Sequence, residues 1–365
     1  MIEKLFFELI QVAMGNRTCL TTSPTPDEWQ SLFEMATKQA LVGICSVAVE
    51  RLKAYGQQPP QPLLWEWIAT VTEIQLRNER LDKQCAKLQK KLLEDGYRSC
   101  ILKGQGIALY YPQELSSYRQ PGDIDIWIDA PRDRVLEYVM RTYPNRSFDA
   151  KHIHYNIFHD TEVEIHWVPS YSCVPSVNRK LKLFFEKQRE EQMTHSIKLH
   201  SIPINLITPT ATFNASYILN HIFGHFLYEG IGLRQIMDLY YVLLRIDNKQ
   251  EVIAVWKSLG LCKIASSVMY VMYEVFGLQE NSMICRLDKK GGKLLLKEIM
   301  EEGNFGCNKD DNLIIKESMW CHVKRRLSRR LSLINYDPKG IFWRPIFRLR
   351  LEWWKREVWR KYRLD

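Results

Sequence analysis

The chain has 365 residues, of which 46% are hydrophobic, and this supports a large core divided into two or three packed units. Its nine cysteines are an odd number, are scattered and include no Cys-x-x-Cys pair, which argues against a disulfide framework or a zinc knuckle. The net charge of +9 resides at the C-terminal end, because residues 322–365 hold fourteen Lys/Arg against four Asp/Glu and the remainder is nearly neutral.

The N-terminus has neither a basic leader region nor a cleavage site, and no apolar run approaches the ~18 residues of a membrane span. Unpaired cysteines are typical of a reducing compartment. We therefore expect a cytoplasmic protein without a transmembrane segment.

Residues 1–96 are expected to form an N-terminal helical region. Thr25 stands before Pro26 and an acid-rich first turn, which is typical of a helix N-cap. A Gly/Pro-containing break at residues 56–60 separates this part from a second long helix over about residues 63–93. We expect these helices to pack against the sheet that follows them and to cover it.

Residues 97–170 are expected to form the catalytic core, and they open with a short apolar strand that ends at Lys103. Gly104, Gln105 and Gly106 follow it and lead into a helix-like segment. A strand, a glycine turn and a helix start place backbone N–H groups where an anion binds. We expect this turn to cradle phosphates, while Lys103 either contacts a phosphate or lies along apolar surface at the strand end.

The run from Gly122 to Ile128 alternates carboxylates with large apolar residues, which predicts a strand with one buried and one functional face. Asp123 and Asp125 therefore share one surface, with side chains about 6–7 Å apart. Two such acids repel each other unless a cation lies between them, and Mg²⁺ favours carboxylates together with substrate phosphates. The pattern indicates phosphoryl or nucleotidyl transfer. Arg119, just before this strand, either neutralises triphosphate charge or forms a loop salt bridge.

Two further alternating runs, residues 152–159 and 162–167, are separated by a polar turn of two residues and predict a β-hairpin. In the second run Glu162, Glu164 and His166 share one face. If this strand lies beside the Asp-x-Asp strand, a third carboxylate comes within about 5 Å of the first two. Glu164 and Glu162 are both candidates for this role on the strand pattern alone, and His166 either acts near an acceptor or is a packed histidine.

The glycine turn, the Asp-x-Asp strand and the later acid together resemble the polymerase β-like nucleotidyltransferase superfamily. More narrowly, the chain resembles a bacterial family of uncharacterised nucleotidyltransferases. The segments that carry this resemblance are Leu102-Lys103-Gly104, Tyr110-Tyr111-Pro112, Arg119, Gly122-Asp123-Ile124-Asp125 and Glu164-Ile165-His166-Trp167.

The resemblance implies an α+β fold with a small mixed sheet and flanking helices, framed by N- and C-terminal helical regions. It implies transfer of an NMP group from an NTP, such as ATP, to a hydroxyl acceptor. The metal, Mg²⁺ or Mn²⁺, would be held by the catalytic acids Asp123, Asp125 and Glu164. The nucleotide would be bound by Lys103, Gly104, Gln105, Gly106 and Arg119.

Residues 171–321 are expected to form a C-terminal helical domain. Thr208 before a proline marks a helix start, and helical spacing continues from there to about Leu278, with interruptions at Gly224, Gly230-Ile231-Gly232 and Gly260. The polar segments 289–292 and 301–312 are expected to be loops.

Four polar residues of this helical domain also resemble the same family, which tends to carry a His-rich helix that ends in an Arg and an Asp. His221 and His225 lie one turn apart, so they could share a metal ion, with Asp238 as a third ligand. Alternatively, these residues and Arg234 form a polar seam that lines the acceptor side of the cleft.

Residues 322–365 form a basic, Trp-rich tail with apolar residues at helical spacing over residues 346–364. Three hypotheses fit this composition. The Trp stripe packs on the body, or the tail binds an anionic membrane surface at the inner face of the membrane, or it binds a nucleic-acid backbone.

A non-catalytic module that binds a nucleotide or a partner and only retains the fold is the alternative to an enzyme. A membrane-associated accessory of polysaccharide assembly is a further hypothesis, suggested by the tail and compatible with catalysis. The sequence leaves the acceptor open among a small molecule, a sugar intermediate, an RNA and a protein.

Overall fold

The computed structural model describes residues 2–144, 147–199, 201, 203–303 and 336–362. Helices dominate, and they surround one four-stranded sheet and one two-stranded sheet. This architecture confirms the predicted α+β fold class with a small mixed sheet and flanking helices. The predictions for Cys307, Cys321, most of the loop 301–312 and the first part of the tail lie outside the described residues.

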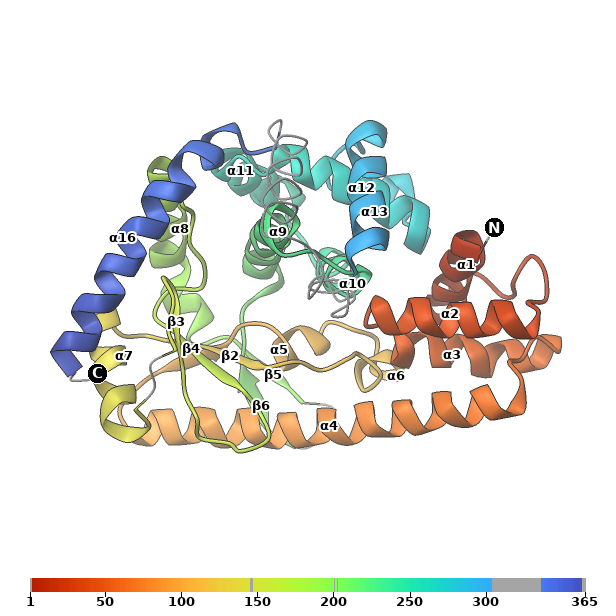
Figure 1. The fold of residues 1–365 in the computed structure, drawn as a ribbon, viewed down its shortest axis with the longest axis horizontal. Helices are drawn as coiled ribbons and strands as arrows, with labels where there is room; N and C mark the ends of the chain where they lie inside the picture. The colour runs from red at the N-terminus through yellow and green to blue at the C-terminus, as the bar shows by residue number, and fades with distance from the viewer. Residues whose placement is uncertain (1, 145–146, 200, 202, 304–335, 363–365) are drawn as a thin grey trace, which may run out of the picture.

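Four helices precede the sheet: α1 (Ile2–Met14), α2 (Pro26–Lys38), α3 (Val42–Leu52) and α4 (Gln61–Glu94). Thr25 caps α2 as predicted, because its hydroxyl accepts a bond from the Glu28 amide and the Glu28 carboxylate accepts one from the Thr25 amide at 2.9 Å. The long α4 agrees with the predicted second helix and runs beneath the sheet along the base of the molecule (Figure 1).

The four-stranded sheet has the order β1-β2-β4-β3. Its strands are β1 (Ser99–Ile101), β2 (Ile124–Ile128), β3 (His152–His154) and β4 (Val163–His166). β2 pairs with β1 antiparallel and with β4 parallel, while β3 pairs with β4 antiparallel. β4 therefore lies beside the Asp-x-Asp strand, which is the arrangement that brings a third acid to the first two.

The two strands of the predicted hairpin are present, but the prediction of a two-residue turn between them is wrong. Strand β3 ends at His154, and pairing continues only through a bond from the Tyr155 amide to the Val163 carbonyl at 2.8 Å. The chain then forms a longer connection, in which Asp160 is drawn to α4 by Arg80 at 2.8 Å and Gln84 at 2.9 Å. These polar contacts replace the tight turn.

The two faces of the sheet pack against different helices. The isoleucines of β2 join side chains of α4 and of α7 (Arg132–Thr142) in one hydrophobic cluster. On the opposite face, Trp127 stacks on Phe213 of α9 (Ala211–Tyr228) with ring centroids 6.2 Å apart. Asp125 shares the face of Trp127, since strand side chains alternate. The functional face therefore lies beneath α9.

The chain after the sheet is more structured than predicted. It forms α8 (Pro175–Gln192) and a two-stranded sheet of β5 (Ser196–Lys198) and β6 (Asn205–Ile207), neither of which was predicted. The helices after these strands are α9, α10 (Leu233–Leu243), α11 (Lys249–Leu259), α12 (Cys262–Phe276) and α13 (Lys289–Glu302). No described helix is long and apolar enough to cross a membrane.

Two glycine predictions in this region are wrong. Gly224 lies inside α9 and does not interrupt it. Residues 289–292 begin α13, where a Cβ on Gly292 would lie 2.3 Å from the Cβ of Tyr270. Glycine here permits close packing of α12 on α13, so it does not mark a loop.

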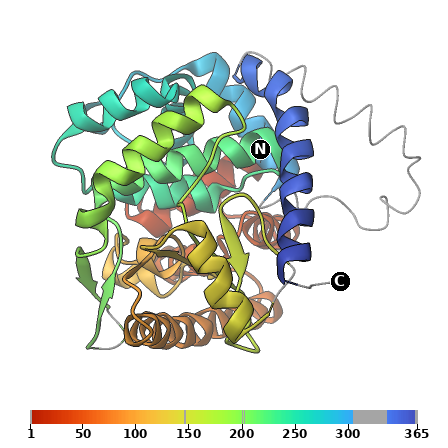
Figure 2. The same ribbon diagram turned by 90° about the vertical axis from the view of Figure 1, so that its left-hand side faces the viewer.

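The described part of the tail forms α16 (Pro338–Tyr362), which lies along the flank of the molecule near α7 and α8 (Figures 1 and 2). Trp354 contacts Phe148 and Trp167 with ring centroids 5.4 Å and 6.1 Å away, and Val358 is buried. The stripe therefore packs on the body, as the first of the three tail hypotheses predicts.

Candidate active site

The sheet register brings two of the three predicted acids side by side. Asp125 and Glu164 are directly paired residues of the parallel strands β2 and β4. Asp123 stands immediately before β2, two residues from Asp125 and on the same face. Glu162 is exposed, so the choice of Glu164 as the acid beside Asp125 agrees with the geometry.

The carboxylate of Asp125 is compensated by cationic and imidazole groups of the protein. Its Oδ1 lies 2.9 Å from Lys103 Nζ and 2.8 Å from His166 Nε2. Burial opposes ionisation, but Lys103 and His166 overcome this, and the pKa of Asp125 is lowered. The other oxygen, Oδ2, is buried and has no hydrogen-bond partner in the described part of the chain.

The remaining two acids have opposite electrostatic environments. Glu164 Oε2 lies 2.8 Å from His152 Nδ1 and 3.3 Å from His166 Nε2. Burial works against the ionised form, but these two imidazoles lower the pKa of Glu164. The negative charge of Asp125, together with burial, raises the pKa of Asp123. Asp123 therefore carries the repulsion that the sequence predicted for the pair.

Lys103 is an ion-pair partner of Asp125, a contact that neither prediction named, and its contact with a phosphate stays a prediction. Burial disfavours its charge, yet the carboxylates of Asp125 and Asp123 outweigh burial and raise the pKa of the ammonium group. A second lysine, Lys151, is near enough to this cluster to interact with it electrostatically, and burial followed by the charge of Lys103 lowers its pKa. Sequence reasoning missed Lys151, although it directly precedes the alternating His-x-His run of β3.

Neighbouring atoms pack closely against the glycine turn at residues 104–106. Gly104 has φ of +53°, and a Cβ there would lie 3.2 Å from the Asp123 carbonyl. A Cβ on Gly106 would lie 2.4 Å from Thr208 Oγ1, and the Gly106 amide already donates to the Lys103 carbonyl at 3.0 Å. The Gly106 amide is therefore already engaged within the turn, and the binding of phosphate by the turn as a whole stays a prediction.

Gln105, which follows the first glycine of the turn, points away from it. It begins the four-residue helix α5 (Gln105–Ala108), and its buried amide donates to Asp82 of α4. The side chain thus holds the turn on α4.

Arg119 forms a salt bridge, which was one of its two predicted roles. It is 3% exposed, and its Nε and Nη2 donate to the Asp238 carboxylate at 2.7 and 2.8 Å. Tyr111 also donates to this carboxylate, at 2.7 Å. Because its guanidinium is occupied and buried, Arg119 is removed from the nucleotide-binding set. Arg234 lies nearby and donates to the Gln120 carbonyl at 2.9 Å.

The four polar residues of the helical domain separate into two groups. His221 and His225 pack ring against ring, with centroids 4.1 Å apart, and His225 Nδ1 lies 2.8 Å from Glu229. Burial, and then the neighbouring His225, lower the pKa of His221, which also faces Lys103. Asp238 is bound to Arg119, so a metal site of His221, His225 and Asp238 is wrong.

The residues present fit a divalent metal ion at β2 and β4. Single ligand atoms of Asp125, Glu164 and His166 lie within 4.8 Å of one another. The unpartnered Oδ2 of Asp125 offers a ligand atom that no described residue uses. Asp123 belongs to neither of the two groups of potential metal ligands found among the described residues. It would therefore lie beside the group of Asp125, Glu164 and His166.

A cavity of about 510 Å³ adjoins the functional face. Trp127, two residues after Asp125 on β2, lines it, together with residues of α7, α8 and α16. Its volume is in the range of small-molecule sites. The lining combines aromatic and charged side chains, among them Trp167, Tyr171, Phe185, Phe347, Arg132, Lys182 and Arg189.

The model of a family described as "Uncharacterised nucleotidyltransferase" matches residues 25–277 of this chain. None of the curated proteins matches it. Among solved structures, the chain is similar to an antigenic nucleotidyltransferase-like protein from Paracoccidioides brasiliensis, with 13% sequence identity and a TM-score of 0.29. That similarity covers 54% of this chain and 97% of the other.

Proposed function

The chain belongs to the uncharacterised nucleotidyltransferase family, and from this premise we propose that it is a Mg²⁺-dependent enzyme that transfers an NMP group from an NTP to a hydroxyl acceptor. The observation that carries the proposal is the parallel register that sets Glu164 beside Asp125, with Asp123 on the same face. An exposed acidic strand would need neither this pairing nor a buried carboxylate oxygen without a partner.

Asp125 and Glu164, with Asp123 beside them, would hold Mg²⁺ or Mn²⁺. When bound, such an ion neutralises charge that develops on the triphosphate. In the reaction, the acceptor oxygen forms a bond to the α-phosphorus. The bond between the α-phosphorus and the oxygen that bridges the α- and β-phosphates breaks, and pyrophosphate leaves. Glu164, which lies beside Asp125 in the register, would complete the metal site on the acceptor side and help to remove the hydroxyl proton.

Lysine side chains supply positive charge beside the glycine turn. Lys103 is held at Asp125 by an ion pair of 2.9 Å, and Lys151 interacts electrostatically with the same carboxylates. An entering triphosphate offers both ammonium groups a new anionic partner. We assign phosphate binding to these two lysines as well as to the turn.

The cavity beside Trp127 is our candidate for the acceptor site. Trp127, which lines it, is two residues along β2 from Asp125 and on the same face, although none of the three acids lines the cavity itself. Its aromatic walls suit a flat or ring-shaped molecule, while Arg132 and Lys182 suit an anionic group.

Labelled-nucleotide transfer tests the proposal. The protein would be incubated with Mg²⁺, each α-labelled NTP in turn and fractionated cell extract, and label transfer to any fraction measured. Asp123→Asn should abolish transfer, whereas Asp160→Asn, the same change at an acid held by Arg80, should not. NTP binding without label transfer under every condition would favour the non-catalytic alternative.

The outer face of α16 supports a second, membrane-surface role, which is compatible with catalysis. Phe342, Leu349 and Trp353 are 66%, 75% and 64% exposed and recur at helical spacing among arginines and lysines. We propose that this face binds anionic lipid surfaces. Full-length protein should sediment with anionic vesicles, and a Leu349→Ser/Trp353→Ser variant should not. Equal sedimentation of both proteins, or preference for tRNA over vesicles, would contradict this role.

A further inference from the structure

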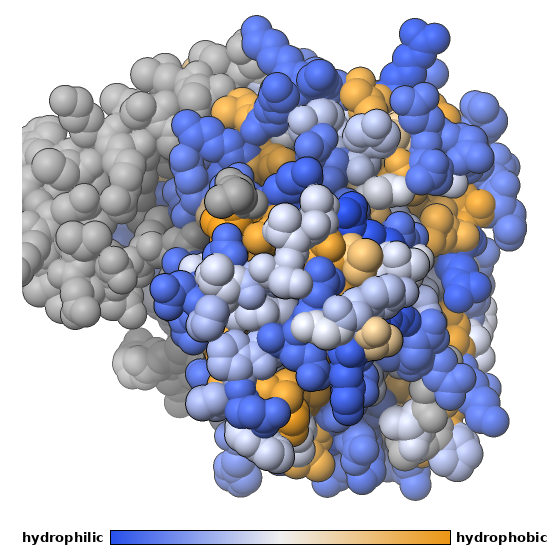
Figure 3. Space-filling view, turned by 90° about the vertical axis from the view of Figure 1, so that its right-hand side faces the viewer, coloured by the Kyte–Doolittle hydropathy of each residue, from blue (hydrophilic) through white to orange (hydrophobic). Residues whose placement is uncertain are grey.

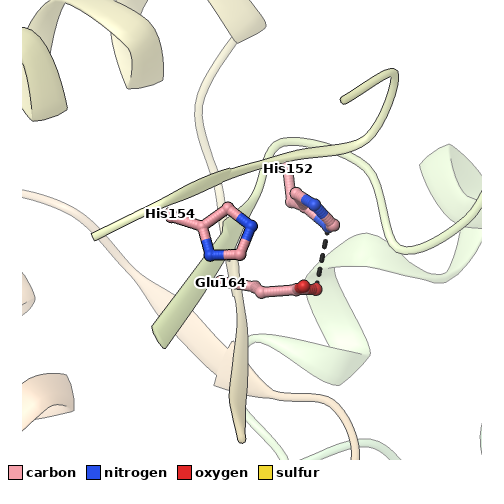
Figure 4. Close-up of side chains that lie close together, drawn as sticks. All are labelled: His152, His154 and Glu164. Carbon is pink, nitrogen blue, oxygen red and sulfur yellow. Dashed lines mark ion pairs between the residues drawn. The ribbon is translucent and has the colours of Figure 1, made fainter. Parts of the chain in front are cut away.

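Three side chains converge on the edge of the sheet beside the acids already described. His152 and His154 project from the same face of β3, with ring centroids 5.4 Å apart. Glu164 of β4 is directly opposite His154 in the antiparallel register. One ligand atom of each lies within 4.8 Å of the others. Figure 4 shows the two rings and the carboxylate grouped together, with His152 linked to Glu164.

The donor atoms of this group suit a different metal from Mg²⁺. Two imidazole nitrogens and one carboxylate oxygen are the ligands that Zn²⁺ and neighbouring transition metals prefer, whereas Mg²⁺ takes oxygen ligands. The His154 imidazole has no hydrogen-bond partner among the described residues, so binding an ion would break no existing bond there. All three residues are partly buried, which limits water yet leaves access.

We propose that His152, His154 and Glu164 form a binding site for a transition-metal ion of the Zn²⁺ class. Three protein ligands would leave one coordination position open for water or for a ligand oxygen. The site is separate from the group of Asp125, Glu164 and His166, but the two share Glu164. Where the proposed function also holds, Zn²⁺ at this site draws Glu164 away from Asp125.

Metal binding by the protein itself tests the site, without any nucleotide. Metal-free, full-length protein would be titrated with Zn²⁺ by calorimetry, and the ligands of the bound ion identified by zinc X-ray absorption. We expect one ion per chain, two imidazole ligands and no sulfur ligand. His154→Gln should weaken binding by at least about tenfold. His225→Gln, the same change in α9, is the matched control and should bind as the unmodified protein does.

Other outcomes would overturn the site. A single imidazole ligand, with affinity lost in His166→Gln and kept in His154→Gln, would place the ion at Asp125 instead. Sulfur ligands would place it at cysteines, and absence of binding would leave no site at all. If His154→Gln does not fold, the ligand count on the unmodified protein decides alone. None of these results depends on NTP transfer, so this site and the proposed function can fail separately.

Discussion

Asp125 shows how single residues determine the electrostatics of the candidate site. It is 1% exposed, and one of its oxygens is shared between Lys103 and His166. An isolated buried carboxylate would be very costly, so these partners are what permit it to remain ionised. No ion pair of Asp123 is found in the described part of the chain, and Asp125 and burial raise its pKa against the opposing charge of Lys103. The charge of Asp125 therefore stabilises the metal-free fold, whereas the charge of Asp123 destabilises it.

The two acids should respond differently to the same substitution. Asp125→Asn removes the charge that holds Lys103, so it should destabilise the metal-free protein by about 1–3 kcal/mol. Asp123→Asn relieves repulsion, so the melting temperature without metal should be unchanged or slightly higher. Thermal melting of both variants in chelator-treated buffer checks this. A lower melting temperature for Asp123→Asn than for Asp125→Asn would contradict the charge arrangement.

Glu164 predicts a pH dependence of stability. An acid whose folded pKa is lowered from its ordinary value of 4.5 adds stability above that value and loses it as pH falls through the folded pKa. The melting-temperature difference between the unmodified protein and Glu164→Gln should therefore be large at pH 7 and should narrow below about pH 4.5. Glu162→Gln, the same change at an exposed position of the same segment, is the matched control.

At the scale of elements, α16 combines two surfaces on one helix. Its inner face presents Trp354, Val358 and Phe347 to the body, with Phe347 stacked on Tyr171 at 5.0 Å. Arg132 of α7 lies over the Trp354 ring at 4.7 Å and adds a cation–π contact. Phe347 and Arg132 also line the cavity, so docking of α16 completes its wall.

Replacement of the neighbouring tryptophans Trp353 and Trp354 of α16 should change the free energy of unfolding by different amounts. Trp354→Ala removes packing against Phe148 and Trp167 and should lower stability by about 1–3 kcal/mol. Trp353→Ala, at a side chain 64% exposed, should change it by less than about 0.5 kcal/mol. Denaturant unfolding of both variants measures the contrast, and equal effects would mean that α16 does not dock by this stripe.

At the scale of the whole molecule, α4 connects two hydrophobic clusters. Its first half contributes Trp67 to the cluster of the N- and C-terminal helices, and its second half contributes Leu81 and Leu88 to the cluster beneath the sheet. Away from this core, the face shown in Figure 3 carries hydrophobic residues only as small patches among hydrophilic ones. Within the core, α4 packs against one face of the sheet and α9 packs against the other.

The buried pair of Arg119 and Asp238 joins the loop before β2 to α10. Asp238→Asn would leave the guanidinium buried without its counter-ion, so it should cost about 3–5 kcal/mol. The double variant Arg119→Met/Asp238→Asn should recover part of this loss, because the Arg119 charge is removed together with its counter-ion, although Arg234 also loses the nearby charge of Asp238. A double-mutant cycle measured by denaturant unfolding checks the coupling, and additive effects would show that the pair contributes nothing beyond its separate side chains.

The sequence by itself determined the helix cap at Thr25, the long α4 and the Asp-x-Asp strand, because periodicity and capping are local properties. Periodicity left Glu162 and Glu164 equal, and the resemblance of Glu164-Ile165-His166-Trp167 to the family favoured Glu164. Only the tertiary structure decided which charges meet. Lys103 lies on Asp125, Arg119 lies on Asp238, and Lys151 interacts with the acids electrostatically from a segment far along the chain. Such pairings join residues distant in sequence, and no local pattern records which cation is brought to which carboxylate.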